Sequence, residues 1–189
     1  MNKKFLVVIS ILFLPITLLF FIVKFFIKLI ENKRIKSFLN GITINDIDAI
    51  TGYQFEEIVA YLFNYFRFKA KTTKRSGDYG VDIFATKNNI KYCIQTKLYF
   101  GHKVGSSAVQ EINTGKNYFN CDYAIIMTNS FYSKQALDMS DKLGIILFDR
   151  NDVAKLLLNY KNNNKRYLKK LMEVKINGRN STHFITRAY

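Results

Sequence analysis

Three polar side chains in the middle of the chain have the types and spacing that metal-assisted chemistry needs. Asp82 lies at the start of one short apolar run, 81–85, and Gln95 and Lys97 follow a second run, 90–94. A polar tip separates the two runs, which predicts a β-hairpin of two adjacent antiparallel strands. Because side chains alternate along a strand, Gln95 and Lys97 share one face. A carboxylate, an amide and an ammonium group therefore converge on one patch, where burial is costly unless a ligand or metal satisfies them.

The order of these motifs resembles the PD-(D/E)xK nuclease superfamily, and within it the Mrr-type restriction endonucleases of type IV restriction. The resemblance rests on Phe-Glu at 55–56, Gly-Asp-Tyr-Gly-Val-Asp at 77–82 and Gln-Thr-Lys at 95–97, and it covers roughly 51–158. Gln95 stands where other members of the superfamily carry Glu. The resemblance implies a DNA endonuclease that hydrolyses phosphodiester bonds with a divalent metal, in restriction of foreign or modified double-stranded DNA.

The resemblance also implies a role for each site residue. Asp82, Gln95 and Glu56 would hold Mg²⁺, with Mn²⁺ as an alternative, and Glu56 would supply the negative charge that a Gln lacks. Lys97 would orient the attacking water and stabilise the charge that builds on phosphorus. These four residues are the predicted catalytic set. Two alternatives stay open: a catalytically inactive, membrane-tethered nucleic-acid-binding module, and an unrelated α/β domain with a polar edge strand.

A helix is predicted from Thr51 to about Phe66. Its apolar residues form one stripe at 100° per residue: Phe55, Ile58, Val59, Leu62, Phe63 and Phe66. Glu56 lies at the edge of this stripe, whereas Glu57 lies nearly opposite, in solvent. Glu56 is therefore the carboxylate of this helix that could reach a site, the alternative being an ordinary solvated helix face.

The second half of the chain alternates between strand and helix patterns. After a first strand within 68–73 and the hairpin, the pattern predicts a helix to about Tyr118, then strand 124–127, helix 133–143, strand 145–148 and a helix through Leu158. Such alternation favours parallel crossovers onto a sheet that begins as a hairpin. The expected fold class is α/β, with a restriction-endonuclease-like mixed sheet flanked by helices on both faces.

Basic and aromatic residues beside the central motifs are candidates for contacts with DNA. Lys71, Lys74 and Arg75 precede the glycine-containing loop, and Tyr99 and Lys103 follow Lys97. Near a phosphodiester-cutting site these side chains are expected to contact the DNA backbone. A solvated basic surface is the alternative.

The formal net charge of +15 is concentrated in the flanks of the chain. Residues 1–36 contain seven basic residues and one acidic residue, and residues 161–189 contain eight and one. This charge permits a nucleic-acid partner without requiring one. The two cysteines lie in or beside apolar runs, as buried free thiols do, and the two histidines are far apart, which argues against a zinc site.

The N-terminal segment predicts a membrane anchor. Phe5 to Val23 is nineteen residues without a charge, long enough as a helix to cross a bilayer. A secretory signal peptide is the alternative, although this run is longer than such peptides usually carry. Because more Lys and Arg follow the span than precede it, the rest of the chain is expected in the cytoplasm, at the inner (cytoplasmic) membrane. A homodimer is an open alternative for its assembly.

The expected organisation has four parts. A transmembrane anchor with a juxtamembrane basic segment occupies 1–36, and a linker occupies 37–50. The nuclease domain spans 51–160, and a basic tail spans 161–189. The tail carries a weakly amphipathic pattern, so a peripheral helix is expected there rather than a second domain.

Overall fold

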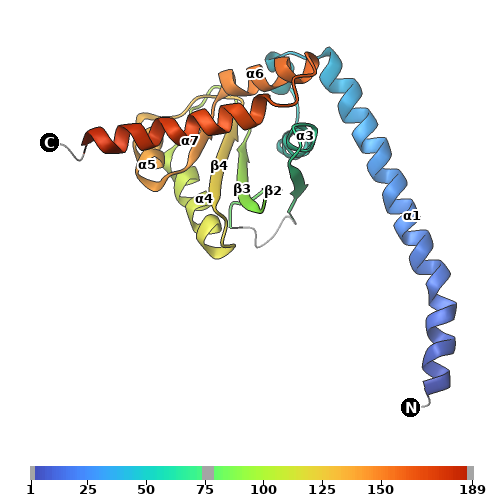
Figure 1. Ribbon diagram of the computed structural model, residues 1–189. Helices are drawn as coiled ribbons and strands as arrows, with labels where there is room; N and C mark the ends of the chain where they lie inside the picture. The colour runs from blue at the N-terminus through green and yellow to red at the C-terminus, as the bar shows by residue number, and fades with distance from the viewer. Residues whose placement is uncertain (1–2, 74–78, 187–189) are drawn as a thin grey trace. The chain divides into compact units, whose positions relative to one another are not determined.

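The computed structural model describes residues 3–73 and 79–186, and the side chains of 15–73 and 79–177. The chain divides into two compact units, Met1–Asn40 and Gly41–Tyr189. The first unit consists of most of one long helix, α1 (Lys3–Gly41). All other described helices and strands belong to the second unit, which therefore contains the whole predicted catalytic set (Figure 1).

The expectation of a membrane-spanning helix over Phe5–Val23 is not supported. Among the residues that the structure describes, no helix is long and apolar enough to cross a membrane. From Pro15 onward α1 carries three charged residues within its next four turns or so, Lys24, Lys28 and Glu31. The side chains of residues 3–14, which include more than half of the predicted span, lie outside the described part.

A five-stranded sheet forms the centre of the second unit, with the strands in the order β1-β2-β3-β4-β5. Its strands are β1 (Lys69–Thr72), β2 (Ile83–Lys87), β3 (Ile90–Lys97), β4 (Tyr123–Thr128) and β5 (Ile146–Phe148). The first three strands pair antiparallel, and β4 and β5 run parallel to β3. The prediction of a mixed α/β sheet that begins with a hairpin is confirmed.

The hairpin turns at the predicted polar tip. Asn88 and Asn89 both have positive φ, 51° and 64°, as a two-residue turn between twisted strands requires. One strand bound differs from the prediction, because β2 begins only at Ile83 and does not include Asp82. Asp82 thus precedes β2, and its side chain rather than its backbone takes the next hydrogen bond from β3.

Six helices surround the sheet in the second unit as far as it is described. They are α2 (Ile44–Ile47), α3 (Gly52–Tyr65), α4 (Ser106–Tyr118), α5 (Lys134–Leu143), α6 (Arg150–Lys161) and α7 (Tyr167–Thr186). Helix α3 begins at the predicted position because Thr51 caps it: the Thr51 hydroxyl accepts from Gln54 N at 3.2 Å. The Gln54 side chain in turn accepts from Thr51 N at 2.9 Å, which completes a capping box.

The face of the sheet that α4 covers also carries Gln95 and Lys97. Cys93 packs in one buried cluster with Ala108, Val109 and Ile112 of α4. Because side chains alternate along β3, Gln95 and Lys97 lie on the same face as Cys93, as predicted. Helix α3 contacts β1, β2 and β3 but contributes no residue to this cluster, and Figure 1 shows α3 and α4 on either side of the strands.

A charged network joins α2 to the start of α6 and to the loop that follows β3. Arg150 forms two hydrogen bonds with the Asp48 carboxylate, at 2.7 and 2.9 Å. Asn129 donates to Asp48 at 2.8 Å and also holds the backbone of Tyr99, accepting from Tyr99 N and donating to Tyr99 O. The chain directly after Lys97 is therefore fixed by side-chain hydrogen bonds rather than free.

We expect Arg150→Ala to lower the free energy of unfolding by about 1–2 kcal/mol, because it leaves the partly buried Asp48 carboxylate without its bidentate partner. The hydrogen bonds from Arg150 hold the pKa of Asp48 below its ordinary value, outweighing the effect of burial. A lowered folded-state pKa stabilises the fold above the unfolded-state pKa, and this stabilisation disappears as the pH falls through the folded-state pKa. Urea unfolding should therefore separate the variant from wild type at neutral pH and less so in acid. Arg166→Ala, at an exposed position, is the control and should change little.

Candidate active site

Asp82 is held in place by a tight turn before it and by β3 beside it. The turn contains Tyr79 and Gly80, both with positive φ, 48° and 78°. Asp82 N donates to Ile94 O at 2.9 Å, which continues the ladder of the hairpin by one residue. One carboxylate oxygen, Oδ2, accepts from Thr96 N at 2.6 Å and from the Thr96 hydroxyl at 3.0 Å. The carboxylate is thus oriented at the end of β3 where Gln95 and Lys97 lie.

Gln95 is 2% exposed, and its two amide atoms have different surroundings. Its Nε2 donates to Glu111 Oε2 at 2.7 Å. Its Oε1 is buried and has no hydrogen-bond partner among the residues that the structure describes. An unsatisfied buried oxygen costs about 1–3 kcal/mol, so this atom is a position where a ligand would be favoured.

Gly80 allows the turn to approach Gln95 closely. A Cβ at this position would lie 2.8 Å from Gln95 Nε2 and 3.0 Å from Glu111 Cβ. The positive φ of Gly80 adds a second reason for glycine, since it has no Cβ to clash in this conformation. The turn that precedes Asp82 therefore packs directly on the pair formed by Gln95 and Glu111.

Lys97 forms an ion pair with the same carboxylate oxygen, from Lys97 Nζ to Glu111 Oε2 at 2.8 Å. Partial burial raises the pKa of Glu111, but the hydrogen bonds from Lys97 and Gln95 outweigh it, so that the pKa lies below its ordinary value. Glu111 is therefore ionised at neutral pH. A single carboxylate from α4 thus positions the amide and the ammonium group of β3.

Glu111 is the site residue that sequence reasoning missed. It lies on α4, and the packing of Val109 and Ile112 against the sheet brings it over the end of β3. One signal could have found it, because Glu111 is the only acidic residue between Asp82 and Asp122. That signal has meaning only once α4 is known to cover the Gln95 face.

The remaining predicted metal-binding and DNA-binding residues lie on several different elements of the fold. Glu56 lies half-buried on α3, a helix that contributes no residue to the cluster on the Gln95 face, so its role as a metal ligand stays a prediction. Lys71 on β1 and Lys103 in the loop after β3 are exposed, and the Tyr99 side chain is 37% exposed. Lys74 and Arg75 lie outside the described residues.

The donors gathered here are oxygen atoms, which hard cations such as Mg²⁺ prefer. They come from the Asp82 and Glu111 carboxylates and from the Gln95 amide. The described residues contain no group of three His, Cys, Asp or Glu side chains suited to a metal. Because the Gln95 amide oxygen is uncharged, these three groups would offer a cation one negative charge fewer than three carboxylates would.

Comparison with solved structures found several similar chains. The chain is similar to a protein of unknown function, AF1548, with a TM-score of 0.52 and 19% identity, over 59% of this chain and 67% of that one. It is also similar to the DNA modification-dependent restriction endonuclease AspBHI (TM-score 0.48, 15% identity, 80% of this chain) and to the MspJI restriction endonuclease in complex with a 27-mer oligonucleotide (TM-score 0.43, 17% identity, 57% of this chain). The matched regions span 40% and 29% of those two enzymes.

The sequence itself identifies a family. No curated protein matches the chain. The sequence model of the restriction endonuclease family Mrr_cat matches residues 47–157, which is more than half of the chain and includes Asp82, Gln95, Lys97 and Glu111. The chain therefore belongs to the Mrr_cat family of restriction endonucleases.

Proposed function

We propose that this chain is a DNA endonuclease that hydrolyses phosphodiester bonds with a divalent cation bound at Asp82 and Gln95. The observation that carries the proposal is the buried Oε1 of Gln95, which has no described hydrogen-bond partner although the other end of the same amide is held by Glu111. A cation next to this oxygen would satisfy it. The oriented Asp82 carboxylate nearby would supply charge to the same ion.

Each residue of the site has a role in this proposal. Asp82 and Gln95 would hold Mg²⁺ or Mn²⁺, and Glu111 would supply the second negative charge for which Glu56 was predicted. When bound, the cation polarises the phosphoryl group and lowers the pKa of a bound water. Lys97 would orient the attacking water and stabilise the charge that develops on the phosphate. Glu111 would also fix the ammonium group of Lys97 at the end of β3.

Restriction of foreign or modified DNA is the biological role that we propose with this chemistry. The support for it is the membership of the Mrr_cat family over residues 47–157. Double-stranded DNA is accordingly the proposed substrate. Basic side chains on the same face of the sheet as Gln95 are consistent with a polyanionic substrate.

A second candidate function is a nucleic-acid-binding module without catalysis. The observation that favours it is the small number of acidic ligands, because the described residues contain no group of three metal-ligating side chains. In this alternative the ion pair between Lys97 and Glu111 persists in the DNA complex. The two candidates differ in what a divalent cation does to bound DNA.

We expect the full chain to nick supercoiled plasmid in Mg²⁺ or Mn²⁺ and to leave it intact in EDTA. Gel electrophoresis of the plasmid over time measures the nicked and linear products. The control is the same preparation of Asp82→Asn, which tests for contaminating nucleases. A wild-type chain that binds the plasmid but never nicks it with either metal would support the binding module instead.

A further inference from the structure

Three exposed lysines, Lys71, Lys69 and Lys91, form what we call the lysine track on the face of the sheet that carries Gln95. Lys69 and Lys71 come from the edge strand β1, and Lys91 comes from β3. The lysine track has no ion pair with any residue of the described ranges 15–73 and 79–177. Of the carboxylates, Asp122 lies nearby and accepts from the backbone N–H of Lys91.

The strand register places the lysine track on this face. Lys69 pairs with Thr86, and Thr86 pairs with Lys91, so one row across three strands carries two lysines and a hydroxyl. Directly paired residues share a face, and every second residue along a strand returns to it. The row of Lys91 therefore lies on the same face as Cys93, Gln95 and Lys97.

The spacing of the rows suits a phosphate backbone. Lys71 pairs with Phe84, and Phe84 pairs with Cys93, which puts Lys71 in the row between the active site and the row of Lys91. Gln95 lies four positions beyond Lys91 along β3, which is about 13 Å at about 3.3 Å per residue. Because α4 covers Cys93 between these two residues, a duplex at Gln95 would reach Lys91 by passing over β1, where Lys71 is exposed. One strand of duplex DNA carries one charge per about 3.4 Å of helix axis, so it would present several phosphates over this distance.

The row formed by Lys69, Thr86 and Lys91 lines a basic surface depression. It is lined by Lys69, Thr86, Asn88, Asn89 and Lys91, together with Arg67 and Lys87. Arg67, Lys69 and Lys91 are exposed, and no acidic side chain lines the depression. A lining that contains cations, hydroxyl and amide donors and no acidic side chain suits an anionic ligand.

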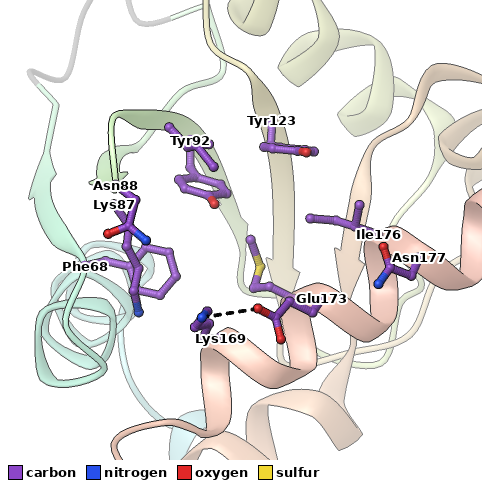
Figure 2. A pocket seen from close by; sticks show the side chains of 11 residues that line it. Phe68, Lys87, Asn88, Tyr92, Tyr123, Lys169, Glu173, Ile176 and Asn177 are labelled. Atoms are coloured by element: carbon purple, nitrogen blue, oxygen red, sulfur yellow. Dashed lines mark ion pairs between the residues drawn. The ribbon is translucent and has the colours of Figure 1, made fainter.

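The pocket on the other side of the hairpin is chemically different. Figure 2 shows that Phe68, Tyr92 and Tyr123 line it together with residues of α7, and that Lys169 pairs there with Glu173 at 3.5 Å. Lys87 lines this pocket too, and its Nζ donates to Phe66 O at 3.2 Å and lies over the Phe68 ring. The two lysines of this pocket, Lys87 and Lys169, thus already have partners within the protein. The lysine track is therefore the better surface for a polyanion.

We propose that the lysine track binds the phosphate backbone of duplex DNA on one side of the active site. The proposal rests on the proposed function, because it takes the end of β3 at Gln95 and Lys97 as the place where the cleaved phosphate sits. Lys71 then contacts a phosphate near the site, and Lys69 and Lys91 contact phosphates further along the duplex. Thr86 lies between these two lysines and adds a hydroxyl donor.

The test is the salt dependence of DNA binding, measured with the full chain in EDTA so that cleavage plays no part. Fluorescence anisotropy of a labelled duplex gives the affinity of wild type and of the double variant Lys69→Ala/Lys91→Ala over a series of salt concentrations. Each lost phosphate contact lowers the log-log slope by about 0.9, so the double variant is expected to lose about 1.8. The matched control is Lys142→Ala/Lys155→Ala, which removes the same charge from exposed positions on α5 and α6 and should keep the slope.

An unchanged slope in Lys69→Ala/Lys91→Ala overturns the proposal, and so does an equal loss in the control. Co-sedimentation with vesicles containing phosphatidylserine is a second arm. If the double variant loses vesicle binding and keeps its DNA slope, the lysine track binds anionic lipid and the proposal fails. A reduced slope in a chain that never cuts plasmid would leave this inference standing and reject only the proposed function.

Discussion

Asp82→Asn is expected to abolish plasmid cleavage, with a loss of about 10² to 10³-fold or more, as for removal of one preorganised electrostatic group. The substitution removes the principal negative charge offered to the cation. It keeps an oxygen that can accept from Thr96 N, so the end of β3 should keep its geometry. Nicking of supercoiled plasmid in Mg²⁺ measures the rate.

Lys97→Ala is expected to cause a loss of similar size for a different reason. It removes the cation that would stabilise the developing phosphate charge, and it leaves Glu111 with only the hydrogen bond from Gln95. Asp138→Asn and Lys142→Ala are matched controls, because they make the same charge changes at exposed positions of α5. DNA binding in EDTA should survive both active-site changes, and should improve slightly for Asp82→Asn, because less negative charge faces the phosphates. Cleavage at the wild-type rate in either variant would remove that residue from the catalytic set.

Local patterns predicted the part of the fold that holds the site. Two short apolar runs on either side of the polar tip 87–89 were enough to predict the hairpin, and the period of two then placed Gln95 and Lys97 on one face. The alternation of strands and helices after Lys97 was enough to predict β4 and β5 as parallel neighbours. These features follow from patterns within short segments of the chain.

The contacts of Glu111 with Gln95 and Lys97 could not be predicted in this way. A helical stripe shows which side of a helix is buried, and this argument correctly put Glu56 at the edge of the buried face of α3. It does not show which face of the sheet the helix covers. Because α4 rather than α3 packs on the Gln95 face, Glu111 is the residue that reaches Gln95 and Lys97. The position of Glu111 beside Gln95 and Lys97 therefore follows only from the tertiary packing of α4 on the sheet.

In the N-terminal segment, the sequence predicted the helix correctly, but the structure does not support the predicted membrane span. Its helical character was correctly indicated by composition, and α1 is a continuous helix through Pro15. The prediction counted apolar residues within 5–23 alone. Helix α1 continues beyond this segment and includes Lys24, Lys28 and Glu31, whose charges a bilayer core disfavours. Helix length and membrane insertion are separate properties, and only the first follows from the structure.

Gln95→Leu and Gln95→Glu should separate the metal-binding role of Gln95 from its packing role. Leu removes Oε1, the buried atom without a described partner, so the variant is expected to lose most metal affinity and cleavage. Its stability without metal should change less, because removal of the unsatisfied Oε1 offsets the loss of the hydrogen bond from Nε2 to Glu111. Thermal unfolding in EDTA and calorimetric titration with Mn²⁺ measure the two properties. A Leu variant with unchanged Mn²⁺ affinity and cleavage would exclude Gln95 as a ligand.

Gln95→Glu is expected to tighten metal binding and to keep substantial activity. In wild type the Gln95 amide donates to Glu111 at 2.7 Å, so a Glu at this position would put two carboxylates in contact. Like charges at this distance raise the pKa of the pair and destabilise the metal-free site, and a bound cation removes that repulsion. The variant should therefore be less stable than wild type in EDTA and gain more stability from Mn²⁺, with the gain growing as the pH rises through the raised pKa.

The double variant Gln95→Glu/Glu111→Gln restores a single negative charge with the hydrogen bond reversed, so its Mn²⁺ affinity should return towards that of wild type. If the double variant binds Mn²⁺ as tightly as Gln95→Glu alone, the charge of Glu111 does not contribute to the cation site, and its role is to position Lys97 alone.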